Sequence, residues 1–219
     1  MSKSKQAEAP RLYLLTPRLA DVGDFAPKLE AAMDTGDIAC VLLRLATNDE
    51  GDAKKLIKAL ASMVQQRDCA LLIDKPDIVA RAGADGAHLR GTGPTLETAI
   101  EDAVESLRPD RIVGVGGVKT RHDAMVAGEQ DIDYLMFGDP EPDGYTPPIE
   151  DTADWVDWWA QIFNVPCVGY APRLADVGTL AAAGADFIAV GDCIWDDPRG
   201  PVAALDDATM AMNLAVRPA

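Results

Sequence analysis

The sequence predicts a single-domain (β/α)₈ barrel, the TIM-barrel fold, and three observations support this. Short apolar runs with strand character alternate with segments whose apolar residues recur at helical spacing. The stretch at 71–89, LLIDKPDIVARAGADGAHL, reads as strand, short helix and strand, which implies parallel pairing. The length of 219 residues suits such a barrel. A doubly wound sheet is the alternative, but eight strand-helix units in so short a chain favour closure.

The predicted strands and helices alternate along the whole chain. The run at 38–45 is nearly all apolar apart from Arg44, and the segment at 49–66 is the clearest amphipathic helix, with lysines opposite its apolar stripe. Strands are expected at 11–16, 38–45, 71–73, 87–89, 111–118, 134–138, 165–170 and 187–190. Helices are expected at 25–33, 49–66, after residue 77, and at 95–107, 121–128, 151–163, 175–183 and 202–216.

Two segments fall outside this alternation. Residues 1–10 are predicted to form a disordered leader, which leaves 11–219 as the barrel domain. Residues 138–151, GDPEPDGYTPPIED, form a long loop rich in Pro and Gly. Loops of this length in compact domains are usually functional or mobile.

Charge and composition exclude several classes of partner. A formal charge of −16 would repel phosphates, which argues against nucleic acid and anionic membrane surfaces. No apolar run reaches membrane-spanning length and the N-terminus does not resemble a signal peptide, so we expect a cytoplasmic protein. The four cysteines are widely spaced without a CxxC pair, which favours reduced thiols. A small-molecule ligand is expected, and a homo-oligomer is left open.

Four side chains in or after predicted strands are candidates for ligand or metal binding. Asp74 follows the third strand, at the end where barrel sites are built. Arg44 is costly in an apolar strand, so it either pairs with a carboxylate such as Asp74 or binds substrate at the mouth. His88 is either a hydrogen-bonded barrel histidine or a catalytic base. Tyr13 either packs in the core or stacks on a substrate ring.

One heptapeptide, PRLADVG, occurs twice, at 17–23 and at 172–178, after the first and seventh predicted strands. The eighth strand lies between these two in a barrel, so Arg18 and Arg173 could flank its loop. Either the two copies are a local solution to the same strand-to-helix turn, or the two arginines bind an anion at the mouth.

The chain resembles the thiamine phosphate synthase family. The segment IDKPDIVARAGADGAHL at 73–89 is similar to the family pattern NDRxDxAxxxGADGVHLGQ, and the resemblance extends through RIVGVGG, DYLMFG, AAAGADFIAV and DPRGPVAAL. Family members are (β/α)₈ barrels that join hydroxymethylpyrimidine diphosphate to thiazole phosphate with Mg²⁺, giving thiamine phosphate and pyrophosphate. The resemblance implies that Asp74 holds Mg²⁺, that Arg44 binds pyrophosphate, and that Arg173 replaces a glycine phosphate site.

The family pattern is incomplete at the barrel mouth. Arg90-Gly-Thr-Gly replaces the segment with the second metal carboxylate, Gly116 and Asp192 stand where family serines align, and the Thr-x-Thr-Lys clamp is absent. These changes remove phosphate donors and add carboxylates at the rim: Asp139, Glu141, Asp143, Asp192, Asp196 and Asp197. Two functions remain open. One is a divergent thiamine phosphate synthase, and the other is a non-catalytic, small-molecule-binding or regulatory barrel with an acidic mouth.

Overall fold

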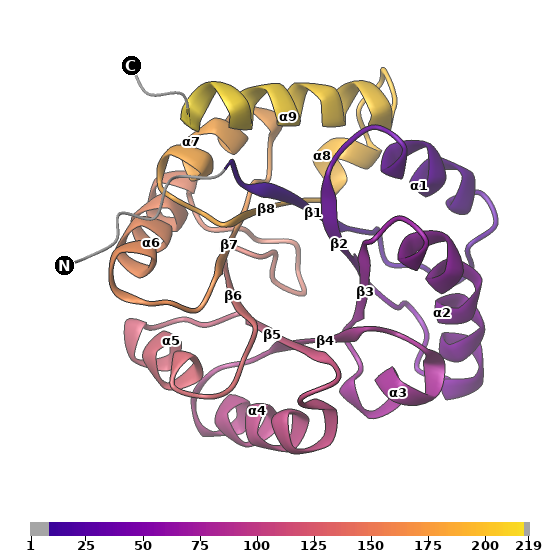
Figure 1. Cartoon of the computed structure of the whole chain (residues 1–219), viewed down its shortest axis with the longest axis horizontal. Helices are drawn as coiled ribbons and strands as arrows, with labels where there is room; N and C mark the ends of the chain where they lie inside the picture. The colour runs from indigo at the N-terminus through magenta and orange to yellow at the C-terminus, as the bar shows by residue number, and fades with distance from the viewer. Residues whose placement is uncertain (1–8, 217–219) are drawn as a thin grey trace.

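Eight parallel strands close into a barrel, as the sequence predicts (Figure 1). The strands pair in chain order, and β8 pairs with β1 to close the sheet. The computed structural model describes residues 9–216, so nearly all of the predicted leader lies outside the described residues. The strands are β1 (Arg11–Leu15), β2 (Ile38–Leu43), β3 (Ala70–Ile73), β4 (Gly86–Arg90), β5 (Ile112–Gly116), β6 (Tyr134–Phe137), β7 (Cys167–Tyr170) and β8 (Phe187–Val190).

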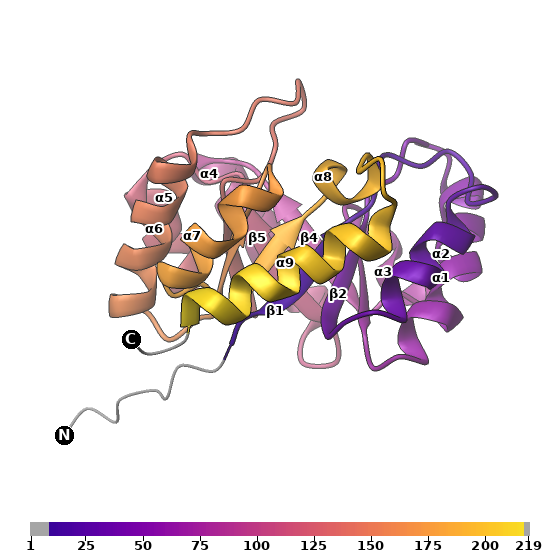
Figure 2. The same cartoon turned by 90° about the horizontal axis from the view of Figure 1, so that it is seen from above.

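Helices form a ring around the barrel and follow the predicted order (Figures 1 and 2). α4 begins two residues before the predicted start, with Pro94 in its first turn, where proline is tolerated. α8 was not predicted, because four residues are too few to show a helical period. The helices are α1 (Ala26–Met33), α2 (Glu50–Gln65), α3 (Val79–Ala82), α4 (Gly93–Leu107), α5 (Arg121–Gly128), α6 (Ile149–Ile162), α7 (Val177–Ala182), α8 (Asp192–Trp195) and α9 (Pro201–Val216).

Alternating strand residues build two separate cores. Leu12 and Leu14 belong to the large core between the strands and the helices, whereas Tyr13 and Leu15 belong to the core inside the barrel. The interior is a packed layer of side chains rather than a channel. Its buried members are Tyr13, Leu15, Cys40, Leu42, Leu72, Tyr134, Met136, Val168, Tyr170 and Ala189.

Three aspartates fix the N-terminal ends of neighbouring strands. Each precedes an even-numbered strand, and its carboxylate accepts a backbone N–H from the strand before it at 2.8 to 3.0 Å. This contact satisfies a donor that the barrel ladder leaves open. The pairs are Asp85 with Leu71, Asp133 with Val113, and Asp186 with Cys167.

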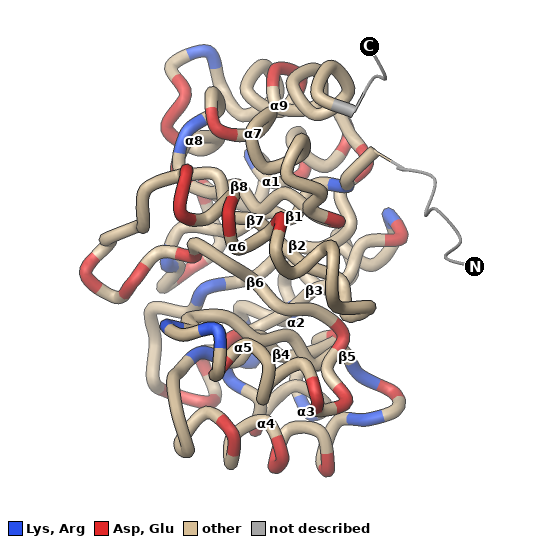
Figure 3. The backbone as a smooth tube through the Cα atoms, turned by 90° about the vertical axis from the view of Figure 1, so that its left-hand side faces the viewer, with Lys and Arg blue, Asp and Glu red and all other residues tan. Residues whose placement is uncertain are grey.

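The charges are distributed along the whole chain. Its 36 acidic residues outnumber its 20 lysines and arginines, and both signs are interspersed over the helices and loops (Figure 3). Among the described helices, none is both long and apolar enough to cross a bilayer.

Candidate functional site

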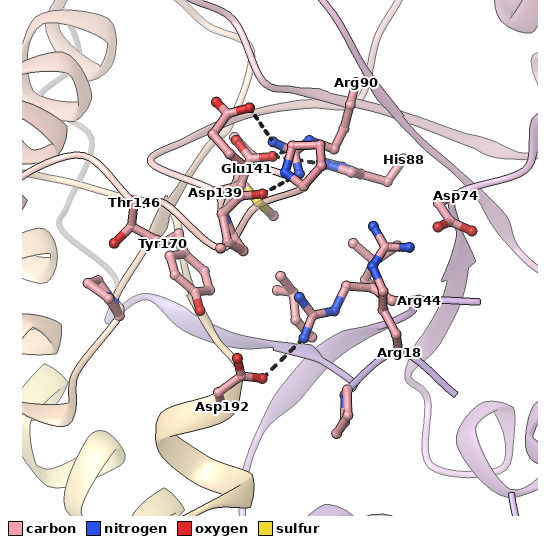
Figure 4. A pocket seen from close by; sticks show the side chains of 18 of the residues that line it. Arg18, Arg44, Asp74, His88, Arg90, Asp139, Glu141, Thr146, Tyr170 and Asp192 are labelled. Carbon is pink, nitrogen blue, oxygen red and sulfur yellow. Dashed lines mark hydrogen bonds and ion pairs between the residues drawn. The ribbon is translucent and has the colours of Figure 1, made fainter. Parts of the chain in front are cut away.

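A cavity lies at the barrel mouth, beyond the C-terminal ends of the strands, where this fold builds its sites (Figure 4). It has a volume of about 580 Å³. Leu15, Leu42 and Met136 from the interior core form its apolar floor. Its charged lining consists of three arginines (Arg18, Arg44 and Arg90) and five carboxylates (Asp74, Asp139, Glu141, Asp192 and Asp196).

Arg44 follows β2 and lines this cavity. Its Nη2 lies 3.2 Å from Asp192 Oδ1, and its Nε donates to the carbonyl of Thr16. Of the two readings of the sequence, the structure therefore places Arg44 in an ion pair, with Asp192 of α8 as the partner rather than Asp74. The side chain is 17% exposed, so it still presents one edge to the cavity.

Asp74 and Arg18 lie on the same side of the cavity (Figure 4). Asp74 Oδ1 is buried and has no hydrogen-bond partner. Burial raises the pKa of Asp74 above its usual range, and the charge of Arg18 partly opposes this rise. Arg18 donates one long hydrogen bond of 3.5 Å, to the Leu45 carbonyl. Of the three cavity arginines, Arg18 therefore makes the weakest polar contacts with the protein.

His88 lies within a hydrogen-bonded chain that passes through the barrel. Its Nδ1 is 2.9 Å from the hydroxyl of Tyr134, which is 2.9 Å from the hydroxyl of Tyr13. On the other side, His88 Nε2 faces Asp139 Oδ2 at 3.9 Å. His88 lines the mouth cavity, but Tyr13 is buried in the barrel interior and does not. Burial raises the pKa of Tyr13 and of Tyr134 well above the ordinary tyrosine value.

Arg173 lies outside the mouth cavity. Its guanidinium forms two hydrogen bonds of 2.9 and 2.7 Å with the carboxylate of Asp176, three residues along the chain. The β7 end contributes Tyr170 and Pro172 to the cavity instead. The two arginines of the repeated heptapeptide are thus not brought together at this cavity, and only Arg18 lines it.

Two residues that line the mouth, Arg90 and Tyr170, are not among the predicted site residues. Arg90, the last residue of β4, ion-pairs with Asp139 at 2.8 Å and approaches Glu141 at 3.9 Å. Both carboxylates were predicted at the rim, and so were Asp192 and Asp196. The sequence feature that could have marked Arg90 as a site residue is its position directly after His88-Leu89, at a strand end. Tyr170 gave no signal, because an aromatic residue in a strand usually packs.

The donor set at the mouth supplies only part of the Mg²⁺ site that the resemblance implies. Mg²⁺ is usually held by one or two carboxylates together with waters and substrate phosphates. Asp74 offers one carboxylate, with the guanidinium of Arg18 nearby. Among the described residues, no three His, Cys, Asp or Glu side chains come together as a metal-binding group. The side chains of residues 9–216 therefore do not form a complete magnesium site by themselves.

Sequence comparisons assign the chain to a family. It matches the family model described as thiamine monophosphate synthase over residues 12–194. A thiamine-phosphate synthase from Rhodospirillum centenum is 41% identical over 207 residues, which cover 93% of this chain and 98% of that relative. One from Hyphomonas neptunium is 34% identical over 206 residues, covering 89% and 90%.

The solved structures agree at the level of fold. A thiamine phosphate pyrophosphorylase from Pyrococcus furiosus superposes with a TM-score of 0.76 at 20% identity, covering 94% of this chain and 97% of that chain. A 3-hexulose-6-phosphate synthase from Salmonella typhimurium gives 0.72 at 15% identity, with 93% and 99% covered. These likenesses show the shared barrel. With the family match over most of the sequence, they lead to one conclusion: this chain belongs to the thiamine monophosphate synthase family.

Proposed function

We propose that the mouth cavity binds an unphosphorylated, neutral or cationic heteroaromatic molecule related to thiamine, and that this protein is a ligand-binding member of its family. The observation that supports the proposal is the charge of the cavity lining. Five carboxylates face three arginines, and two of those arginines are in ion pairs with carboxylates of the lining.

The electrostatics of such a lining disfavour a diphosphate. A pyrophosphate group would have to displace Asp192 from Arg44 or Asp139 from Arg90, and it would meet the remaining carboxylates as like charges. A cationic ring instead gains from the same carboxylates. The apolar floor and the ring of Tyr170 suit a flat heteroaromatic ligand.

The family's condensation is the second candidate function, and two specific observations favour it. The R. centenum and H. neptunium relatives are named thiamine-phosphate synthase, and they match over nearly their whole length. Asp74 and Arg44, which stand at the motif positions for metal and pyrophosphate, both line the cavity. In that reaction Arg44 would bind the departing pyrophosphate, so its ion pair with Asp192 would have to open. We propose no step through Mg²⁺, since the protein supplies one carboxylate for it.

Calorimetry and a turnover assay on the same protein separate the two functions. The ligands are thiamine, thiamine phosphate, and the pyrimidine and thiazole precursors with and without their phosphates. The assay incubates both phosphorylated precursors with Mg²⁺ and measures thiamine phosphate. We expect thiamine to bind more tightly than thiamine phosphate, and no product above the enzyme-free background. Tighter binding of the phosphorylated forms would contradict the binding proposal.

The repeated heptapeptide supplies a matched pair of variants. Arg18→Met changes an arginine of the cavity lining, whereas Arg173→Met changes the equivalent arginine outside it. The affinity for thiamine should differ from that of the unmodified protein in Arg18→Met and should be unchanged in Arg173→Met. Thermal melting confirms that both variants are folded. If product does form, and Asp74→Asn and Arg44→Met abolish it while Arg173→Met does not, the synthase function replaces the binding function.

A further inference from the structure

One outer face of the barrel, formed by α7 and the second half of α9, carries no charge. Residues 177–185 and 208–216 contain no Asp, Glu, Lys or Arg, although 26% of the chain is charged. Among the described helices, α7 is the one without a charged residue. α7 and α9 lie side by side on the outside of the barrel (Figures 1 and 2). This α7–α9 face is therefore a neutral area on a strongly acidic protein.

Two long apolar side chains are exposed on the α7–α9 face. Met210 and Leu214 of α9 are 57% and 61% exposed. Their spacing of four residues places them on the same side of the helix. α7 contributes the exposed residues Thr179 and Ala182, which are small. Covering this face would remove the two long side chains from water without burying a charge.

The close approach of α7 and α9 makes the two helices one continuous surface. A Cβ added to Gly178 of α7 would lie 3.8 Å from the backbone oxygen of Ala211 on α9, so the helices are near each other at this point. Met210 directly precedes Ala211 in the sequence. The exposed apolar side chains of α9 thus lie beside the small residues of α7 rather than on an isolated helix.

A second copy of the chain suits this face better than a charged partner does. Each copy carries a formal charge of −16, so two copies repel each other and can associate only where like charges do not meet. The α7–α9 face meets this condition, and it offers no charge by which a basic or acidic partner would be recognised. The cores of homodimer interfaces are likewise apolar and poor in charged residues.

The exposed apolar residue of α6 does not provide an equivalent surface. Ile162 is 63% exposed, but α6 has four acidic residues and no basic one: Glu150, Asp151, Asp154 and Asp157. Two copies meeting through α6 would bring these like charges together. Ile162 also lies one turn after Trp158, which faces α5, since the guanidinium of Arg121 lies 4.8 Å from its ring. It is therefore on the side of α6 that faces away from α7 and α9.

We propose that the α7–α9 face is the interface of a homodimer, in which Met210 and Leu214 of each copy pack against the same face of the other. An interface that uses one surface on both copies is closed after two copies, so it forms no larger species. Other residues line the mouth cavity, so both mouths stay open. Because the face has two long apolar side chains and no ion pairs, we expect a micromolar dissociation constant rather than a nanomolar one.

Sedimentation velocity measures the association directly. The chain has a mass of 23.3 kDa, and the average mass should rise toward twice this value as the protein concentration increases through the micromolar range. The dimer should become more stable as NaCl is added, because salt screens the repulsion between two acidic copies. A mass that stays at the monomer value at every protein and salt concentration would overturn the proposal. Growth beyond the dimer would overturn the closed interface.

Two residues of nearly equal exposure provide matched variants. Leu214→Glu places a carboxylate on the α7–α9 face, and it should weaken the dimer at least about tenfold, because two like charges then meet across the interface. Ile162→Glu adds the same charge on α6 and should leave the dissociation constant close to that of the unmodified protein. Equal weakening in both variants would show an effect of net charge only and would contradict the interface, as would no weakening in Leu214→Glu. If thermal melting shows that Leu214→Glu is unfolded, Met210→Glu tests the same face.

An uncharged lipid surface is the other occupant that a neutral apolar face fits, and vesicles of phosphatidylcholine test it. We expect the protein not to float with these vesicles in a density gradient. Vesicle binding that Leu214→Glu abolishes, in a protein that does not self-associate, would assign the face to lipid instead of a second copy. None of these measurements contains thiamine or its precursors, so their outcome does not depend on the proposed ligand of the mouth cavity.

Discussion

At the scale of single residues, stability and ligand binding conflict at Asp74. A buried carboxylate oxygen without a hydrogen-bond partner costs stability. Burial raises the pKa of Asp74, and the charge of Arg18 offsets only part of the rise. A group with a raised folded pKa stabilises the native state fully below its unfolded pKa, which is about 3.9 for Asp, and loses this contribution as the pH rises through the folded value. At neutral pH the ionised Asp74 therefore destabilises the fold.

We expect Asp74→Asn to stabilise the protein at pH 7 by roughly 1 kcal/mol, because the amide has the same shape and carries no charge to desolvate. The gain should shrink near pH 4, because the raised pKa of Asp74 makes its carboxyl more protonated there than at pH 7. Urea unfolding at both pH values measures the effect. Asp77→Asn, three residues further along the chain and exposed, should change neither value. A loss of stability at pH 7 would mean that Asp74 has a partner in solution.

At the scale of elements, the repeated heptapeptide shows how far local sequence determines conformation. In the first copy Leu19 pairs with Leu45 in an isolated parallel bridge, and Leu19 N donates to Arg44 O at 2.9 Å. In the second copy Leu174–Asp176 form a 3₁₀ turn that leads into α7. The same seven residues thus adopt two structures, because contacts with neighbouring chain segments compete with the conformational preference of the heptapeptide itself.

The contrast between local sequence patterns and contacts with distant segments explains which predictions from the sequence succeeded. Strands and helices were predicted well because each has a periodic pattern in its own residues. The place of Asp74 at the mouth followed from its position directly after the third predicted strand. Ion pairs between distant segments could not be predicted, since Arg90 ends β4 and Asp139 follows β6, and no local pattern joins them.

The aspartates at the strand starts allow a test of one such element contact. Asp85 Oδ2 accepts the N–H of Leu71 at 2.8 Å, and Gln65 Nε2 donates to the same carboxylate. Asp85→Ala leaves that N–H without an acceptor, which should lower the free energy of unfolding by roughly 1 to 3 kcal/mol. Asp85→Asn retains an acceptor oxygen and should lose less. Denaturant unfolding measures both, and a loss from Asp85→Ala no larger than that from the exposed Asp102→Ala would contradict the role of the contact.

At the scale of the whole molecule, the acidity of the chain and the acidity of the mouth act in the same direction. The chain carries a formal charge of −16, and the mouth lining has five carboxylates against three arginines. A surface field of one sign raises the local concentration of oppositely charged ligands and repels those of like charge. The global charge therefore reinforces the selection that we propose for the cavity, toward cationic rings and away from free phosphates.

This leads to a dependence of binding on ionic strength. The affinity for thiamine, whose thiazolium ring is cationic, should fall several-fold as NaCl is raised from about 20 mM to about 500 mM, because the Debye length shortens from roughly 20 Å to a few ångströms. The uncharged hydroxymethylpyrimidine should bind with little dependence on salt, so the difference between the two ligands measures the electrostatic contribution to thiamine binding.

Asp196→Asn, which removes one charge from the cavity lining, should reduce the salt dependence of thiamine binding. Asp102→Asn, on the outer face of α4, should alter it less, because screening weakens its charge over the greater distance. A thiamine affinity that is independent of salt would show that the carboxylates do not select the ligand, and that the shape of the cavity does.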